Sequence, residues 1–596
     1  MKLINRDPEL LREICAILVS DHKSWHTLPA LARTGKAFFE PAVNTLWRII
    51  PSLSILFFLF PADAWTVEMG QRYWHTHRVS LRRALVPADF ARFHIYAHRI
   101  KVFGDAWASP LIGLRKYMLS REALEALYNY RPTPCLLPDL RQVHACQGVV
   151  PFLSVLLGSH VESVTMLVGC SVRIAEDPRT LRMLSSIPRK CPRLSQLQVS
   201  CGSESKKFMD ATAGLCPALT KLVDFAMPYT PITAAVLDTL ATSLRLKFLH
   251  IFVELDDGPQ SCEALFAHSL AVPSFTKLKE LTINVENIEH ATRFLACVSS
   301  SRLCALHVNC RTPPSAQEAE ALFDALRSHP SRQSLYSLRV DAFHDPSMDM
   351  STRWLTNETL RPLLELRLQL LTLMGFLVDV DDSMLESMAR AWPELHCLSM
   401  AEGERWGTAH PPRATILGII PFIEHCPDIE VIGYRMQTDV FRSGDVCRTH
   451  GRPGRGVTTH RAIELNVGDS RIHDSIEVAS FLSDVAPELC HISNMWRTRD
   501  DLDYDEEMGP DMIAEEDMHY KWQEVRQYSE HFALPLARSS PDCWELISRT
   551  YRHTLLIRNP ISYTAIIADE TTSPTFYFSV KLTPSISSIL SIPDVV

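Results

Sequence analysis

The chain has 596 residues, of which 46% are hydrophobic and 22% charged, an ordinary globular mixture that excludes wholesale disorder and a fibrous chain. Its length fits about three to five domains or one long repeat array. The formal net charge is −9, so the chain as a whole is not predicted to bind nucleic acid. The charge is uneven, because residues 1–120 carry +7 and the remainder −16.

Cysteine usage and hydropathy address the cellular compartment. The 16 cysteines stand at least six positions apart, so no CxxC pair exists for a zinc ribbon or a thioredoxin-like site. The N-terminus is charged where a secretory signal needs an apolar run. The most lipid-like stretch, residues 49–60, is too short to span a bilayer. We therefore expect reduced thiols, no membrane association, and a cytoplasmic and/or nuclear location.

Residues 5–48 are predicted to form short helices. The apolar residues Leu10, Leu11, Ile14, Ile17 and Leu18 give the first helix a broad apolar stripe. A segment of this size buries too little surface to be stable alone. The stripe predicts either a docking surface for a partner or a helical cap on the next domain. Residues 49–135 are interpreted as a helical linker or cap region.

A repeat covers residues 136–500. Its unit is LxxLxL, with apolar residues at positions 1, 4 and 6, and its average interval of about 29 residues is at the upper edge of leucine-rich spacing. The first positions of the units are Leu140, Val161, Leu194, Leu219, Leu246, Leu278, Leu303, Leu335, Leu363, Leu395, Ile429, Ala462 and Leu489. Two units depart from the pattern, because Asp224 and Asn494 stand at the sixth position.

Proline marks the same repeat. The chain holds 38 prolines against 21 glycines, and six units carry proline two residues before the anchor, as in Pro393-Glu394-Leu395. Helical patterns precede the clearer ones, and proline ends a helix and favours extended backbone before it. The order helix, proline, short strand predicts an α/β fold, an N-terminal helical domain followed by an irregular leucine-rich-repeat solenoid.

The C-terminal part follows other patterns. Residues 500–517 hold ten acidic side chains and no basic one, which indicates a solvated segment, and a capping helix is expected to follow it within residues 500–530. Residues 531–596 lack the repeat and form a tail of uncertain structure, in which residues 575–582 alternate like a strand.

Catalytic and metal-binding motifs find little support. His94 and His98 have a metal-compatible spacing but lack the glutamate of the zinc-protease motif. The glycine-rich run 451–456 lacks the Gly-Lys-Ser/Thr ending of a phosphate loop. Asp469, Ser470 and His473 are too close in sequence to converge as a triad. We expect no enzyme activity, no metal site and no cofactor.

Several segments resemble a known family. They are PELLREI at 8–14, LPALART at 28–34, KAF at 36–38, LWR at 46–48, AWPEL at 391–395, IPFIEHCP at 420–427, VGDS at 467–470 and VASFLSD at 478–484. The N-terminal segments resemble the F-box, and the whole is similar to fungal F-box-like proteins with irregular leucine-rich repeats.

The resemblance implies a non-catalytic substrate receptor in the ubiquitin conjugation pathway. Such a receptor binds the Skp-type adaptor of a cullin–RING ligase through its F-box and an unknown protein substrate through its repeats. The residues implied to bind the adaptor are Pro8, Leu10, Leu11, Ile14, Leu31, Phe38 and Trp47. The alternative is a leucine-rich-repeat interaction scaffold with a degenerate F-box and no ligase.

In a stacked repeat, the anchors point inward and the alternate strand residues point outward on the concave face. The outward set comprises Gln198, His250, Glu280, Thr282, His307, Arg339, Glu365, Arg367 and Glu464. Their mixed charge predicts either a selective polar surface for the substrate or an ordinary solvated face.

Overall fold

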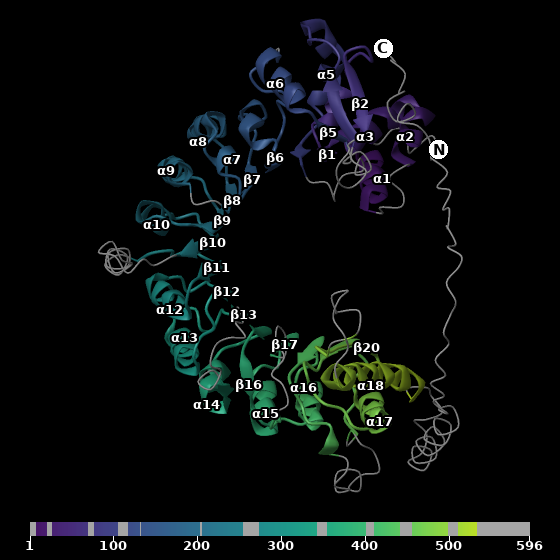
Figure 1. Ribbon diagram of the computed structural model, residues 1–596, viewed down its shortest axis with the longest axis vertical. Helices are drawn as coiled ribbons and strands as arrows, with labels where there is room; N and C mark the ends of the chain where they lie inside the picture. The colour runs from purple at the N-terminus through teal and green to yellow at the C-terminus, as the bar shows by residue number, and fades with distance from the viewer. Residues whose placement is uncertain are drawn as a thin grey trace. The chain divides into compact units, whose positions relative to one another are not determined.

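The computed structural model describes residues 8–20, 27–69, 77–104, 117–131, 133–202, 205–253, 273–342, 354–400, 411–440, 454, 456–496, 498 and 510–532 (Figure 1). These residues form two compact units that divide between Leu246 and Lys247. Each unit combines parallel strands with helices, so the chain is of mixed α/β class, compatible with a solenoid-like repeat fold. The division lies within residues 136–500, which the sequence predicts as one repeat segment.

The first unit begins with three helices, as expected for residues 5–48. They are α1 (Pro8–Ser20), α2 (Thr27–Thr34) and α3 (Lys36–Trp47). Helix α3 packs against both α1 and α2. The side chains of Leu28 and Val43 are fully buried between the helices, and Leu46 is nearly so. The helical character of this segment therefore agrees with its sequence pattern.

Residues 49–135 differ from the expected helical region, because five strands lie among the helices. A separate sheet consists of β2 (Trp65–Met69), β3 (His77–Leu81) and β5 (Tyr117–Leu119), with β2 antiparallel to β3. The two-residue strands β1 (Ile49–Ile50) and β4 (Val102–Phe103) instead begin the parallel sheet of the repeats. Helices α4 (Ser54–Phe57), α5 (Phe90–Ala97) and α6 (Arg121–Tyr130) complete the region. The strands are too short for a clear alternation of apolar and polar residues.

The parallel strands of the first unit follow one another in chain order. After β1 and β4 come β6 (Gln142–Cys146), β7 (Ser163–Gly169), β8 (Gln196–Cys201) and β9 (Asp224–Pro231). The helices that follow these strands are η5 (Val150–Val155), α7 (Val172–Ala175), α8 (Pro178–Lys190), α9 (Lys206–Leu215) and α10 (Ala234–Ala241). The α-helices lie along one side of the strands (Figure 1).

The second unit repeats the same arrangement. Its parallel strands are β10 (Phe248–Val253), β11 (Glu280–Val285), β12 (Ala305–Cys310), β13 (Ser337–Ala342), β15 (Leu370–Met374), β17 (Cys397–Ser399), β18 (Val431–Gly433), β19 (Ile463–Asn466) and β20 (Leu489–Ser493). Its helices are α12 (Ile288–Cys297), α13 (Ala316–Ser328), α14 (Asn357–Leu360), η7 (Arg361–Glu365), α15 (Asp382–Ala391), η8 (Ile416–Gly418), α16 (Ile419–His425), α17 (Ser475–Val485) and α18 (Pro510–Phe532). A second pair, β14 (Trp354–Thr356) and β16 (Leu377–Asp379), is also parallel.

The repeat folds as its sequence dictates, because apolar anchors face the helices and prolines end those helices. Leu303, Leu306 and Val308 are at most 2% exposed, while Cys304, Ala305 and His307 between them are more open. Helices α8, α15, α16 and α17 each end two residues before a proline, as in Ala391-Trp392-Pro393. The helix–proline–strand order predicted from the sequence is therefore the order in the structure.

Two anchors are wrong, and both errors have the same cause. Leu222, not Leu219, starts the unit of β9, so Asp224 is no departure from the pattern, and Phe225 is the residue that pairs with Leu197 of β8. Leu368, not Leu363, starts the unit of β15. Closely spaced leucines let the LxxLxL pattern fit in two registers.

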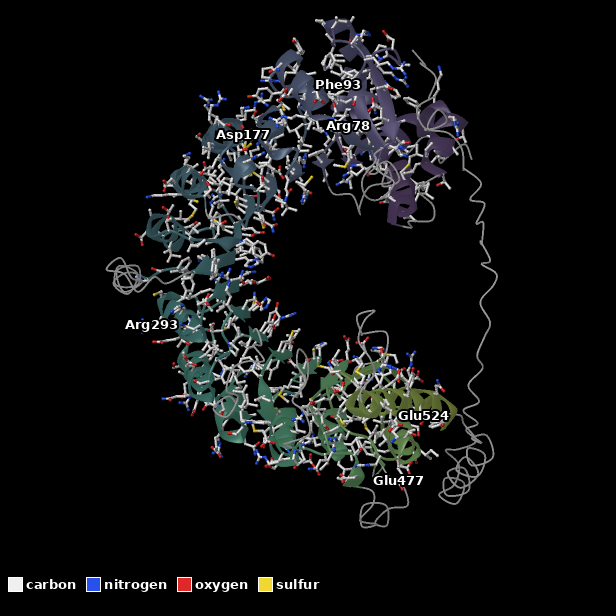
Figure 2. All side chains as sticks on the ribbon, viewed as in Figure 1. Arg78, Phe93, Asp177, Arg293, Glu477 and Glu524 are labelled. Carbon is white, nitrogen blue, oxygen red and sulfur yellow. The ribbon has the colours of Figure 1, made fainter. Side chains whose placement is uncertain are left out.

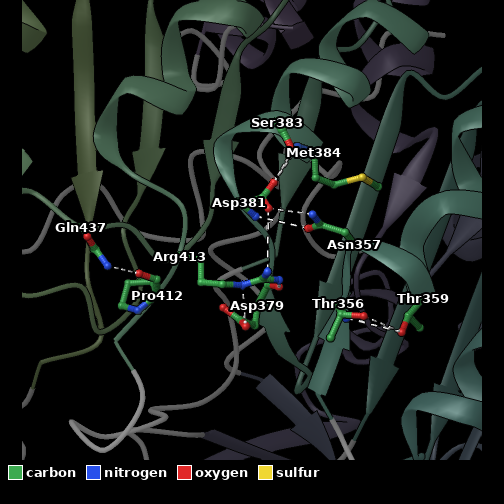
Figure 3. Close-up of polar contacts among 10 residues, drawn as sticks. All are labelled: Thr356, Asn357, Thr359, Asp379, Asp381, Ser383, Met384, Pro412, Arg413 and Gln437. Atoms are coloured by element: carbon green, nitrogen blue, oxygen red, sulfur yellow. Dashed lines mark hydrogen bonds and ion pairs between the residues drawn. The ribbon is translucent and has the colours of Figure 1, made fainter.

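Helix starts are stabilised by side-chain caps, and one of these ties successive repeats together. Asp381 accepts the N–H of Met384 at 3.0 Å, capping α15, and also accepts Nδ2 of Asn357 at 2.9 Å (Figure 3). Arg413 donates to Asp379 at 2.9 Å and lies 3.8 Å from Asp381. Burial would raise the pKa of Asp381, but these donors and the nearby guanidinium lower it overall, so the cap stays ionised.

Helix α18 includes residues 510–517 of the acidic run instead of following the run, and it packs against α17 and β20. Trp522 and Val525 are fully buried, and the Trp522 indole donates to the Ser470 carbonyl at 2.9 Å. Ser475 of α17 donates to Glu524 at 2.7 Å, and the two helices lie side by side (Figure 2 labels Glu524). The expected tail at residues 531–596, with its possible strand, lies almost wholly outside the described residues.

Candidate binding surfaces

A row of polar side chains crosses strands β10 to β13 of the second unit. His250, Thr282, His307 and Arg339 are register partners on successive strands. All four are half-buried, whereas the anchors on either side of each are buried. The row therefore lies on the face of the sheet opposite the buried anchors, where the alternation of the repeat predicts it.

The row is held in place by the carboxylate of Asp341, two residues after Arg339 on β13. The Asp341 carboxylate lies 2.9 Å from Nε2 of His307 and accepts Nε of Arg339 at 2.8 Å. Burial would raise the pKa of Asp341, but the hydrogen bonds with His307 and Arg339 and their charges lower it overall. Asp341 is thus ionised at neutral pH, and it fixes the orientation of two neighbouring side chains from different strands.

Amide and imidazole groups extend this surface towards β10. Asn309 donates its amide to Asn284 at 2.7 Å. Burial lowers the pKa of His250, and this effect is larger than the increase caused by its hydrogen bond with Asn284. His250 is therefore neutral at pH 7. Its Nε2 has no hydrogen-bond partner among the described residues. We call this set the polar cluster: His250, Asn284, His307, Asn309, Arg339 and Asp341.

The polar cluster presents donors and acceptors that are already ordered. A guanidinium, two imidazoles and two amides lie on adjacent strands, spaced about 4.8 Å apart. Such an array can recognise a polar or charged segment of another molecule without first ordering its own side chains. The sequence analysis found His250, His307 and Arg339 but omitted Asn284, Asn309 and Asp341, although all three stand at position 7 of their repeats.

The other predicted substrate-contact residues do not join this row. Gln198 is on β8 of the first unit, Glu280 is exposed at the start of β11, and Glu464 is exposed on β19. Glu365 and Arg367 are corrections, because they precede β15 instead of lying on it. Glu365 ends η7, and its carboxylate lies 3.5 Å from Arg327 of helix α13. The displaced anchor at Leu363 caused this error.

The adaptor-binding residues implied by the resemblance fall into two groups. Leu11 and Trp47 are each only 3% exposed, and the Trp47 ring lies 4.6 Å from that of Tyr96 on α5. These two side chains belong to the interior of the first unit, which corrects their assignment to a partner surface. The amphipathic period shows that a helix has an apolar side, but it does not show which apolar residues its own chain covers.

The remaining residues are more open. Leu10 is 40% exposed and Ile14 half-buried, while Leu31 of α2 and Phe38 of α3 are also half-buried. Pro8 begins α1, and its side chain lies outside the described set. Ile17 is 67% exposed and was not among the predicted site residues. We call Leu10, Ile14 and Ile17 the α1 stripe, since their spacing of four and three places them on one helix face.

Comparisons with known proteins add little beyond this geometry. No protein-family model matches the chain, and no curated protein matches it. Among solved structures, the crystal structure of the Rad7 and Elc1 complex in yeast is similar with a TM-score of 0.34 and 12% sequence identity. The match covers 62% of this chain and 81% of that chain. A likeness this weak carries no argument about function.

None of the helices in the described part of the chain is both long and apolar enough to cross a membrane. Within the same ranges, no group of three or more His, Cys, Asp or Glu side chains is arranged to hold a metal ion.

Proposed function

We propose that this chain is a non-catalytic substrate receptor of a Skp–cullin–F-box type ubiquitin ligase. In this proposal the α1 stripe binds the Skp-type adaptor, and the polar cluster contacts a protein substrate. The observation that carries the proposal is that α1 exposes apolar side chains in a chain whose described residues also form a solenoid-like repeat. Apolar side chains at this spacing suit helix-in-groove recognition.

The energetics of α1 support a partner of this kind. Ile17 is 67% exposed and Leu10 40% exposed, so both retain apolar surface that a partner can remove from water. Full burial of a side chain of this size contributes about 1.5–3 kcal/mol. Leu11, by contrast, already packs within the first unit at 3% exposure. Binding would therefore depend on one face of α1 and folding on another.

The second candidate is an interaction scaffold built on the same repeats, without ligase association. The burial of Leu11 and Trp47 favours it, because the resemblance implies that both residues bind the adaptor. In this case the helices α1 to α3 act as a cap on the first unit. The polar cluster keeps its proposed role in both candidates, so the two differ only in the partner of α1.

Co-expression with a Skp-type adaptor and a cullin separates the two candidates. We expect the wild-type chain to retain both proteins through affinity purification, and the variant Ile14→Ser/Ile17→Ser to lose them. Val172→Ser is a matched control, because Val172 is 51% exposed elsewhere in the first unit. Circular dichroism should show the same fold in all three. A wild-type chain that retains no adaptor would leave the scaffold as the better account.

A further inference from the structure

A cleft of about 890 Å³ in the first unit has five lysine and arginine side chains among its thirteen lining residues. It lies between α1, α3 and the residues that precede β1, β4 and β6. We call its cationic residues the basic cleft: Arg12, Arg48, Arg99, Lys101 and Arg141. Glu13 is the acidic side chain in the lining, and His98 adds an imidazole. The lining therefore carries a formal charge of +4 with the histidine neutral.

Three of these cations are placed together by the sheet itself. Arg48, Lys101 and Arg141 each immediately precede a strand of the parallel sheet. The N–H of Lys101 donates to the carbonyl of Arg48, and the N–H of Arg141 to the carbonyl of Lys101, both at 2.8 Å. Neighbouring strands are about 4.8 Å apart, so three positive side chains arise from adjacent backbone positions. Like charges at this spacing repel unless an anion lies between them.

The chain neutralises only part of this charge. Lys101 lies 2.9 Å from Asp139, and Arg99 lies 2.6 Å from Glu40. Arg12, Arg48 and Arg141 form no ion pair with any residue of the described ranges, and all three are exposed. Three guanidinium groups therefore remain available at one cleft.

We propose that the basic cleft binds a compact small-molecule anion that bears two or more phosphate groups. Guanidinium groups match the oxygens of phosphate in bidentate pairs, and three of them, one on α1 and two just before β1 and β6, suit more than one phosphate. The volume lies within the range of small-molecule sites. Pro41 and Ile49 supply an apolar wall against which the body of such a ligand can pack.

This site is independent of the adaptor proposal. Arg12, Ala16 and Val19 of α1 line the cleft, and their spacing of four and three places them on one face of the helix. The α1 stripe is displaced from them by two residues at each position, or about 200° around the helix. Arg12, Ala16 and Val19 would therefore face the ligand on the side of α1 opposite the α1 stripe, with Glu13 between the two faces.

An acidic peptide is the competing occupant, and a free synthetic peptide with the sequence of residues 500–517 represents it. An extended segment of 18 residues reaches about 60 Å, far beyond a cleft of this size. It would place few of its carboxylates among the three arginines. A compact polyphosphate concentrates its charge instead, so the cleft favours it.

Isothermal titration calorimetry of the full chain with tripolyphosphate tests the proposal. The test variant is Arg48→Gln/Arg141→Gln, and the matched control is Arg189→Gln/Arg193→Gln. The control removes two exposed arginines from the same unit without touching the cleft. Arg12→Gln is a third variant, which changes the cleft from α1 and so covers a folding defect in the test pair.

We expect wild type and control to bind within twofold of each other, and the cleft variants to bind at least tenfold more weakly. Sulfate at equal ionic strength should not compete. Equal losses in the cleft and control variants would overturn the proposal, because they would show a general charge effect. Competition by sulfate would do the same, as would a synthetic 500–517 peptide that binds more tightly than tripolyphosphate.

Discussion

Trp47 gives the sharpest distinction between a residue that holds the first unit together and one that binds a partner. Its side chain is 3% exposed, it ends α3, and its ring packs on Tyr96 of α5. Replacing a buried tryptophan with alanine removes its transfer free energy and leaves a cavity, which together cost about 3–5 kcal/mol. We therefore expect Trp47→Ala to destabilise the first unit by that amount.

The assay is hydrogen exchange with mass spectrometry, which reports the free energy of opening separately for each segment. Residues 36–103 should exchange faster in Trp47→Ala, while β11 to β13 of the second unit should not change. The control is Ile17→Ala, because a side chain that is 67% exposed should change stability by less than about 0.5 kcal/mol. Normal protection in Trp47→Ala together with lost adaptor binding would refute the interior assignment.

Three further predictions concern the second unit. Asp469→Ala should lower the free energy of unfolding, measured with denaturant, by about 3–5 kcal/mol. The change leaves the Arg435 guanidinium, which is 5% exposed and 2.6 Å from Asp469, buried without its carboxylate. The result would contradict this reasoning if Asp469→Ala were less destabilising than the double variant Asp469→Ala/Arg435→Met. Asp341 has a pKa below its usual value of about 3.9, so its stabilisation is present above that pH and is lost as the pH falls through the lowered pKa. Asp341→Asn should therefore be less stable than wild type at pH 7, and the difference should shrink as the pH falls through the lowered pKa. A difference that does not change with pH would contradict the ionised carboxylate. Asp381→Ala should cost about 1 kcal/mol through loss of the α15 cap, seen as faster hydrogen exchange at the start of that helix, and unchanged exchange there would contradict the cap.

The repeat could be predicted from the sequence because its signals are local and repeated. Proline two residues before an apolar anchor ends a helix and begins a strand, as at Pro393 and Leu395, and this needs no knowledge of distant contacts. The register failed where leucines crowd together. Between Leu363 and Leu373 the pattern fits in more than one way, and only the pairing of β15 with β13 selects Leu368.

The surfaces were harder to predict because exposure depends on contacts that are distant in sequence. Trp47 and Ile17 are both apolar residues of N-terminal helices, yet one is covered by α5 and the other is open. The sheet of β2, β3 and β5 was missed for a related reason, since its short strands are defined by pairing between residues far apart in the chain. Asp341 shows the same limit, because its role comes from His307 on the neighbouring strand.

The most direct test of the proposed function is a titration of the purified full chain with a purified Skp-type adaptor. We expect saturable 1:1 binding with a Kd on the order of 1 µM, equivalent to about −8 kcal/mol, and at least a tenfold weaker Kd for Ile14→Ser/Ile17→Ser. The Val172→Ser control should bind like wild type. Absence of wild-type binding at 100 µM adaptor, or equal affinity of the stripe variant and wild type, would contradict the assignment of α1 as the adaptor-binding surface.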